Sequence, residues 1–163
     1  MGKIVLEANE IYKSYANGTN KLNVLTNFTI KVHQGDVITI IGESGCGKST
    51  ALNIMSTLDQ PDKGKVKIDS LDISKLNDMN LSKIRNQKIG FVFQSHYLLP
   101  EFTALENALM PAWIANKDDK KSAVENIFEY LGILKRKNHY PSQLSGGEKA
   151  RVCLTRAIIN EPL

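Results

Sequence analysis

The sequence predicts an α/β fold that has an antiparallel β region at its start, a parallel-sheet core and an inserted group of helices. Residues 37–41 (VITII) and 89–93 (IGFVF) are short apolar runs, typical of strands buried on both faces of a parallel sheet. A glycine-rich loop follows the first run and leads into a helical pattern. Residues 103–140 read mainly as helix, which places the insertion between the second run and the end of the chain.

The β region is predicted from alternation of apolar and polar residues. Residues 4–8 and 28–32 read as strands, and the apolar side chains of the second segment, Phe28, Ile30 and Val32, lie on one face. A third strand is expected at residues 65–69, where Val66 and Ile68 share a face. These segments precede or flank the glycine-rich loop, so we expect them to form the first part of the domain.

The helices are predicted from spacing and from their end signals. We expect helices at residues 49–57, 78–87 and 103–114, and a final helix that ends at Ile159. Pro111 predicts a kink or a restart in the third of these. The clearest pattern is that of Val124, Ile127, Phe128 and Leu131, which follow i, i+3, i+4, i+7 spacing. Gly132 then supplies the stop signal.

Composition narrows the class of protein. The 163 residues are 42% apolar and 23% charged, which are ordinary values for a globular domain. No run approaches the roughly 18 apolar residues of a membrane span, and the first residues lack the apolar core of a signal peptide. The two cysteines and three histidines form no metal-binding pattern. We therefore expect a protein that neither crosses a membrane nor is exported.

The net charge of +4 comes mainly from lysine. The clusters at residues 117–121 and 135–137 mix signs or follow a helix end, and they lack interleaved aromatic residues, so nucleic-acid binding is not expected. A solvated surface explains them better. A modest positive balance also suits a protein that binds a polyanionic nucleotide beside an anionic membrane leaflet.

Residues 42–49 (GESGCGKS) fit the phosphate-loop pattern GxxxxGK[ST], with an apolar strand before it and a helix after it. Glycines let backbone N–H groups turn toward phosphate oxygens, and the following helix adds its positive end. The alternative is a chance match in an ordinary connection. The residues assigned to nucleotide binding here are Gly42, Ser44, Gly45, Cys46, Gly47, Lys48, Ser49 and Thr50.

Two side chains of this loop have specific roles in the prediction. Lys48 brings its charge to the terminal phosphates, and the Ser49 hydroxyl ligates Mg²⁺. Cys46 is open to two interpretations, a small side chain that fills the loop or a site of redox control. The first is the better explanation.

Residues 144–148 (LSGGE) form a second candidate anion site. Ser145, Gly146, Gly147 and Glu148 stand at the start of the last predicted helix, where N–H groups and a hydroxyl can face an anion. The same four residues are also a good N-capping sequence with no ligand at all. This motif alone leaves both interpretations open.

Together, the two motifs resemble those of the ATP-binding subunits of ABC transporters, and the resemblance extends over nearly the whole chain. It implies a P-loop NTPase fold of the ABC type and ATP and Mg²⁺ as cofactors. It also implies a head-to-tail homodimer in which ATP lies between the phosphate loop of one subunit and the LSGGE signature of the other. Ser145 and Gly147 then contact the γ-phosphate across the interface.

The resemblance assigns two further residues. Gln94, at the end of residues 89–93, matches the glutamine that ligates Mg²⁺ or orients water and responds to the membrane partner. With Lys48 it makes up the predicted catalytic set. Tyr15 matches the aromatic residue that stacks on adenine, although Tyr12 lies close by. The alternatives are a solvated glutamine at a strand end and a tyrosine of the core or of a turn.

Residues 93–107 (FQSHYLLPEFTALEN) are similar to the lipoprotein-releasing and macrolide-exporter members of the family, which are LolD-like and MacB-like. The implied partner is a transmembrane permease that contacts residues 94–113. An apolar groove for its coupling helix is expected from Leu98, Leu99, Phe102 and Trp113. Alternatively, these four side chains belong to the core of the helical insert.

The resemblance also implies domain boundaries. Residues 1–102 correspond to the β region and phosphate-loop core, residues 103–145 to the helical subdomain, and residues 146–163 to the signature helix. The family continues beyond this point into a strand that carries the metal-binding aspartate and the water-polarising glutamate. We therefore expect the C-terminal third to be absent, from a fragment or a truncated product, and these 163 residues alone not to hydrolyse ATP.

The expected function is that of a cytoplasmic ATPase subunit, peripheral on the inner face of the cell membrane, that couples ATP hydrolysis to export or lipoprotein release. A truncated, non-catalytic nucleotide-binding remnant is one alternative. Another is a non-transport ABC ATPase of DNA repair or translation. The interval between the two motifs is short and lacks heptads, which disfavours the repair proteins.

Overall fold

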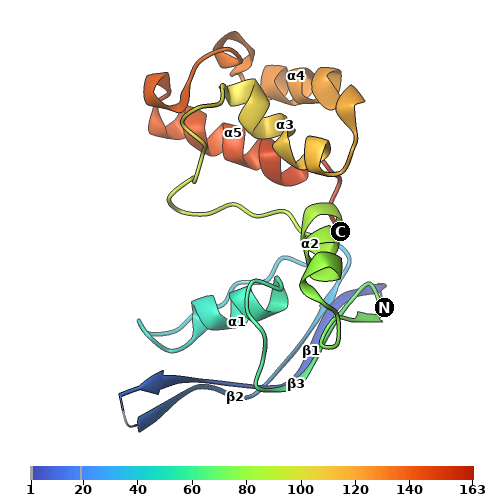
Figure 1. Ribbon diagram of the computed structural model, residues 1–163, viewed down its shortest axis with the longest axis vertical. Helices are drawn as coiled ribbons and strands as arrows, with labels where there is room; N and C mark the ends of the chain where they lie inside the picture. The colour runs from blue at the N-terminus through green and yellow to red at the C-terminus, as the bar shows by residue number, and fades with distance from the viewer. Residues whose placement is uncertain (1, 19) are drawn as a thin grey trace. The chain divides into compact units, whose positions relative to one another are not determined.

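The computed structural model describes residues 2–18 and 20–163. They form two compact units that divide after Leu81, and each unit is described by itself. The first contains the sheet and one helix, and the second is helical (Figure 1). Helix α2 (Asp78–Lys88), which matches the helix expected at residues 78–87, crosses the division. The boundaries expected at residues 102 and 145 stay a prediction.

The sheet of the first unit is antiparallel throughout, in the order β2-β1-β3-β4. Its strands are β1 (Ile4–Asn17), β2 (Asn20–His33), β3 (Lys63–Ile68) and β4 (Leu71–Asp72). The three strands predicted for the β region are confirmed, and two are much longer than expected. Val66 and Ile68 are buried as the alternation predicts, and Ala8, Ile11 and Leu25 join them.

Helix α1 (Lys48–Met55) packs against β1 and β2. Ala51, Ile54 and Met55 form its buried face. The helix expected at residues 49–57 is thereby confirmed, and its contacts place the glycine-rich loop that precedes it beside the β1–β2 hairpin (Figure 1).

The two apolar runs expected as buried parallel strands are not strands. Residues 37–41 have no regular secondary structure, and the side chains of Val37 and Ile41 are 96% and 87% exposed. Residues 89–93 are also irregular, and Val92 and Phe93 are exposed. Within residues 2–18 and 20–163, no strand pairs with either run. A strand forms only where a neighbour bonds its N–H and C=O groups, and apolar sequence does not supply that neighbour.

The second unit is built on helices α3, α4 and α5 with three short 3₁₀ turns. The α-helices are α3 (Ala104–Ile114), α4 (Lys121–Tyr130) and α5 (Gly146–Ile158), and the turns are η1 (Asp118–Lys120), η2 (Leu134–Arg136) and η3 (Pro141–Gln143). Helix α3 contacts both α4 and α5. No helix in the described part of the chain is long and apolar enough to cross a membrane.

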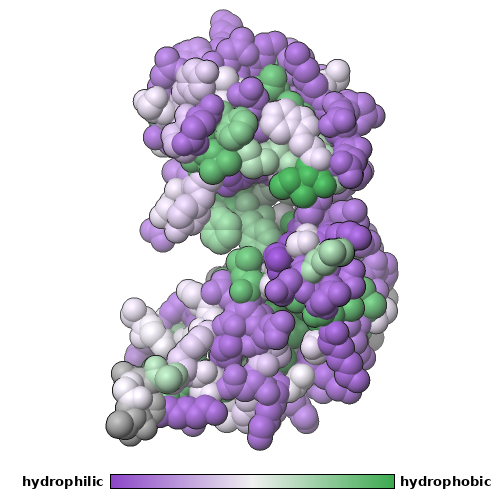
Figure 2. All heavy atoms as spheres, viewed as in Figure 1, coloured by the Kyte–Doolittle hydropathy of each residue, from purple (hydrophilic) through white to green (hydrophobic). Residues whose placement is uncertain are grey.

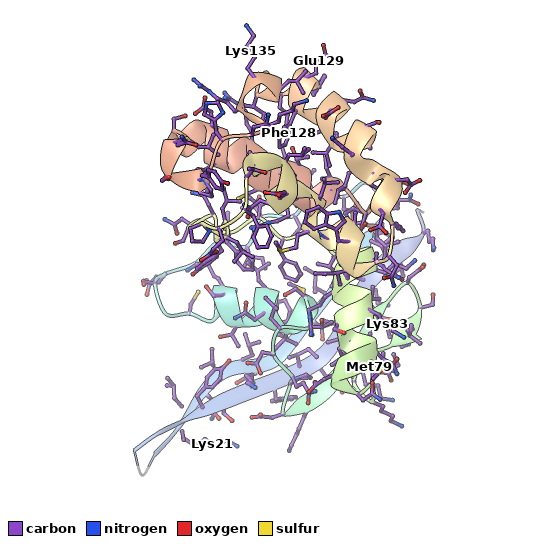
Figure 3. All side chains as sticks on the ribbon, turned by 45° about the horizontal axis from the view of Figure 1, so that its top comes forward. Lys21, Met79, Lys83, Phe128, Glu129 and Lys135 are labelled. Atoms are coloured by element: carbon purple, nitrogen blue, oxygen red, sulfur yellow. The ribbon has the colours of Figure 1, made fainter. Side chains whose placement is uncertain are left out.

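Phe128 is the largest fully buried side chain of this helical unit. It points inward in Figure 3, whereas Glu129 and Lys135 project outward. Val124 is fully buried as well, and Ile127 and Leu131 pack against the same core, so the predicted amphipathic face is confirmed. On the face drawn in Figure 2, polar side chains cover most of the surface of this unit.

The ends of these helices follow the expected signals. Thr103 caps α3 in a reciprocal arrangement with Glu106, and α3 continues through Pro111 as one element rather than restarting there. Gly132 adopts a φ of 71°, the left-handed conformation expected just after α4.

Asn107 links α3 to the irregular segment before it. Its side chain is fully buried. The side-chain oxygen accepts a hydrogen bond from the Leu99 N–H at 2.8 Å. The side-chain NH₂ group donates to the carbonyl oxygens of Leu99 at 3.0 Å, Phe102 at 2.9 Å and Thr103 at 3.0 Å. One amide therefore satisfies much of the backbone of the turn that leads into α3.

We expect Asn107→Ala to destabilise the protein, because it leaves buried backbone groups without partners, at about 1–3 kcal/mol for each group that water does not reach. Asn126→Ala, on the exposed face of α4, is the matched control. Urea unfolding followed by circular dichroism measures the effect. Equal midpoints for the two variants would contradict this account of the turn.

Candidate functional site

The glycine-rich loop, residues 42–49, ends at the N-terminus of α1. Gly47 caps the helix with a φ of 94°, a left-handed conformation that favours glycine. A Cβ atom at this position would lie 2.9 Å from the Val24 carbonyl oxygen in β2. Glycine is therefore required both by the conformation and by the close approach of the loop to β2. Gly45 also has a positive φ, of 82°.

The Lys48 ammonium lies within this loop. It donates to the carbonyl oxygens of Gly42 at 2.8 Å and Glu43 at 2.5 Å. Both acceptors are uncharged and lie in the loop itself. An anion in the loop offers the ammonium a stronger, charged acceptor, so the side chain is placed to exchange these carbonyls for phosphate oxygens.

Cys46 lies against the start of the same loop. Its thiol is exposed and forms no disulfide. A Cβ atom at Gly42 would come within 2.7 Å of the Cys46 sulfur, so the two residues fit closely together. The interpretation of Cys46 as a small side chain that fills the loop agrees with this geometry. Redox control stays a prediction.

Ser49 and Thr50 follow Lys48 in the first turn of α1. The Ser49 side chain is exposed, as a metal ligand needs to be. No group of three His, Cys, Asp or Glu side chains among the described residues is arranged to hold a metal. A hydroxyl together with nucleotide phosphates is the donor set that Mg²⁺ takes in phosphate loops, so Ser49 fits this role.

Tyr15 lies on β1, paired across the hairpin with Leu22 of β2. Its hydroxyl donates to an Asp59 carboxylate oxygen at 2.6 Å, and the Lys13 ammonium lies 5.1 Å from the centre of its ring. The ring remains 41% exposed. Tyr12 is also partly exposed, and its carbonyl accepts a hydrogen bond from the Asp62 N–H. The two partners of Tyr15, Asp59 and Lys13, were not predicted from the sequence.

The LSGGE segment begins α5 as a reciprocal cap. The Ser145 hydroxyl accepts a hydrogen bond from the Glu148 N–H at 3.3 Å, and the Glu148 carboxylate accepts one from the Ser145 N–H at 2.8 Å. In the described part of the chain, the N–H groups of Gly146 and Gly147 have no hydrogen-bond partner, and both glycines are exposed. The two interpretations of this motif are therefore compatible, because the cap leaves free donors at the helix end.

Arg136 reinforces this cap from η2. Its guanidinium donates to the second oxygen of Glu148 at 2.8 Å and lies 3.3 Å from a ring nitrogen of His139. The hydrogen bond from the Ser145 backbone, followed by that from Arg136, lowers the pKa of Glu148 to about 2. Arg136 is twelve residues from Glu148, and no local pattern in the sequence predicts the contact.

Gln94 lies in the irregular segment that continues residues 89–93, and its side chain is exposed. The turn after it has positive φ values at His96, 59°, and Tyr97, 47°. Arg156 of α5 donates to the carbonyl oxygens of both residues, at 2.7 Å and 2.8 Å. The Cys153 thiol donates to the His96 carbonyl at 3.1 Å. The signature helix thus holds the turn that follows Gln94.

The four residues of the expected apolar groove differ in burial, and the groove itself stays a prediction. Leu98 packs against the core of the helical unit, and Phe102 is half-buried. Leu99 and Trp113 are 40% and 37% exposed. The two interpretations of these four residues thus apply to different side chains.

Comparison with known proteins identifies the family. The family model described as ABC transporter matches residues 25–163. The chain belongs to the ABC transporter family. The match includes the whole glycine-rich loop and the LSGGE segment, whereas Tyr15 precedes it.

The chain is similar to several curated ABC proteins. The lipoprotein-releasing system ATP-binding protein LolD of Cytophaga hutchinsonii is 49% identical over 161 residues, which cover 98% of this chain and 72% of that protein. The LolD of Legionella pneumophila strain Paris is 44% identical over 165 residues, with 99% and 72% covered. The chain therefore spans a little under three quarters of the length of these relatives.

Solved ABC structures share the fold. The dimeric structure of MJ0796, a bacterial ABC transporter cassette, matches with a TM-score of 0.87 and 36% identity, over 96% of this chain and 70% of that one. A post-hydrolysis dimer of the ATP-binding cassette MJ0796, bound to ADP and Pi, matches with a TM-score of 0.84 at the same identity and coverage. The antiparallel sheet and helical unit thus belong to an α/β fold of the ABC type.

We expect Glu148→Gln to lower the folding stability of this ABC chain, by an amount that depends on pH. The pKa of Glu148 is lowered from 4.5 to about 2 by folding, so its charge contributes stability above about pH 5, and this contribution is lost as the pH falls from 4.5 toward 2. The difference in melting temperature between wild type and variant should therefore be largest near about pH 7 and shrink toward about pH 2. Circular dichroism melts measure it.

Glu129→Gln, on the exposed side of α4, serves as the control for a general charge effect. If the difference in melting temperature between wild type and Glu148→Gln were the same at both ends of the pH range, the capping carboxylate would not be acting through its charge.

Proposed function

We propose that this chain is the ATP-binding subunit of an ABC transporter and that it couples ATP binding and hydrolysis to lipoprotein release by a membrane partner. The observation that carries the proposal is the glycine-rich loop at the start of α1, whose Gly47 conformation and close contact with β2 leave no room for a side chain. The names of the LolD relatives support the lipoprotein-releasing role.

ATP and Mg²⁺ are the proposed ligands of the loop. The backbone N–H groups of the loop and of the first turn of α1 face the phosphates, and the Lys48 ammonium moves from the loop carbonyls to the β- and γ-phosphate oxygens. Ser49 and Gln94 are the proposed Mg²⁺ ligands. Bound Mg²⁺ neutralises charge that develops on the phosphates during transfer to water.

A head-to-tail homodimer is the proposed active assembly. The free N–H groups of Gly146 and Gly147 and the Ser145 hydroxyl form a second anion site, of the same physical kind as the loop. Because the Ser145 oxygen already accepts from the Glu148 N–H, its own hydrogen is available to a phosphate oxygen. The dimeric MJ0796 cassettes support this arrangement by analogy.

The proposed membrane partner is a permease that contacts residues 94–113. The exposed side chains of Leu99 and Trp113 supply the apolar contacts, and Leu98 packs against the core of the helical unit. Such a contact places the protein at the inner face of the cell membrane as a peripheral subunit, with residues 103–145 as its helical subdomain.

Nucleotide binding without turnover is a second candidate, and one observation favours it. Residues 37–41, which lead into the loop, are not held by a sheet among the described residues. Positioning for catalysis needs a rigid support, whereas binding tolerates a looser one. Calorimetry with ATP beside a phosphate-release assay separates the two.

We expect Lys48→Ala to weaken ATP binding about tenfold to a hundredfold, the size of one charge-assisted hydrogen bond. Isothermal titration calorimetry with Mg·ATP measures the change. Lys83→Ala, an exposed lysine on α2 that Figure 3 labels, is the matched control and should bind as the wild type does. Unchanged affinity in Lys48→Ala would refute the assignment of the loop.

We expect Ser145→Arg in the full-length protein to abolish ATP-induced dimerisation, because a long side chain at the start of α5 blocks the approach of a phosphate to the free N–H groups. Sedimentation velocity with and without ATP measures the dimer. Ser122→Arg, exposed on α4, controls for the added charge. A dimer that persists in Ser145→Arg would rule out the sandwich.

A further inference from the structure

Asp59 and Lys13 form a cluster with Tyr15 in the first unit. One Asp59 oxygen accepts from the Tyr15 hydroxyl at 2.6 Å, and the other accepts from the Lys13 ammonium at 2.7 Å. The ammonium also donates to the Gln60 carbonyl at 2.7 Å, and its side chain is only 12% exposed. Tyr15 is thus held at its hydroxyl end by a carboxylate that is itself held by a buried lysine.

A neighbouring aspartate, Asp62, attaches the same turn to the strand by bonds that do not involve Tyr15. Asp62 accepts hydrogen bonds from both the backbone N–H and the hydroxyl of Ser14, and its own N–H donates to the Tyr12 carbonyl at 2.8 Å. These bonds already fix the turn against β1. Asp59 also bonds the turn, through the Gln60 N–H and the Lys13 ammonium, but its second oxygen accepts from the Tyr15 hydroxyl and so acts on the position of the tyrosine ring.

We propose that Asp59 and Lys13 are positioning residues, which hold the Tyr15 ring in the orientation that its expected stacking on the base requires. The inference rests on the proposed nucleotide-binding function. It adds two residues that fix the plane of the ring before the base arrives.

One face of the ring is occupied, and Tyr15 as a whole remains 41% exposed. The Lys13 ammonium lies over the ring, 5.1 Å from its centre, and so occupies one face through a cation–π contact. A planar base stacks on the opposite face. A ring that is already oriented loses less conformational entropy on stacking, which increases affinity.

The same cluster links the ring to the phosphate loop. Asp59 follows α1, the helix that begins at Lys48. The hydrogen bond to Asp59 raises the pKa of Tyr15, and the Thr50 side chain in the first turn of α1 acts on the same hydroxyl in the opposite direction. The residue that holds the Tyr15 hydroxyl thus follows the helix whose N-terminus ends the phosphate loop.

The experiment compares two ligands, Mg·ATP and inorganic triphosphate, by isothermal titration calorimetry of the full chain. The triphosphate, titrated with Mg²⁺ as ATP is, supplies the three phosphates without the base and the ribose. We expect Asp59→Ala to weaken ATP binding about threefold to tenfold, the effect of one positioning hydrogen bond, and to leave triphosphate binding unchanged. Asp59→Asn keeps an oxygen acceptor for the Tyr15 hydroxyl and should recover part of the loss.

Two further variants make the result specific. Asp62→Ala is the matched control and should affect both ligands equally or neither. Tyr15→Phe removes the hydroxyl and should reproduce the loss of Asp59→Ala, and Asp59→Ala should then have no further effect in the Tyr15→Phe background.

The outcomes separate this inference from the proposed function. If Asp59→Ala binds ATP as the wild type does, while Tyr15→Ala loses affinity, the positioning role of Asp59 is wrong. The proposed nucleotide-binding function is then unaffected. Equal losses for both ligands in Asp59→Ala also overturn it, because the residue then acts on the fold. If wild type binds ATP no better than triphosphate, no base subsite exists and the inference is overturned. Lys48→Ala then tests the phosphate loop independently.

Discussion

The hydrogen-bonded β1–β2 hairpin is the element on which the candidate nucleotide site depends. Strand β1 is paired on both edges, with β2 and with β3, and α1 packs on the two strands of the hairpin. The loop can approach β2 only because Gly47 has no side chain. The hairpin also carries Tyr15. The phosphate loop and the ring proposed to stack on the base are thus placed by the same pair of strands.

Both proposed anion sites use a helix N-terminus but satisfy its donors differently. At α5, the Ser145 hydroxyl and the Glu148 carboxylate complete a cap, and Arg136 holds the carboxylate in place. At α1, Gly47 caps the helix in a left-handed conformation with no side-chain hydrogen bond. The site that is proposed to enclose the phosphates keeps its backbone open, whereas the site proposed to approach from a partner is already rigid without a ligand.

Local signals in the sequence were sufficient for the parts of the structure that local interactions determine. The amphipathic face of α4, its stop at Gly132 and the cap at Ser145 depend on residues a few positions apart, and all three were predicted. Residues 37–41 were expected as a buried strand, but a strand needs a partner from elsewhere in the chain. Contacts such as Arg136 with Glu148 likewise depend on the folded chain, so the sequence contains no pattern for them.

The turn after Gln94 shows how the signature helix can influence a second part of the site. His96 and Tyr97 adopt left-handed conformations that are costly for residues with side chains. The bonds from Arg156 and Cys153 stabilise that conformation from α5, the helix that begins with Ser145. A force on the exposed Leu99, two residues beyond Tyr97, therefore acts on a segment that is hydrogen-bonded to the signature helix. Within the second unit, these hydrogen bonds link the segment of the proposed permease contact to the helix that begins with Ser145, and such a network can carry coupling between the two.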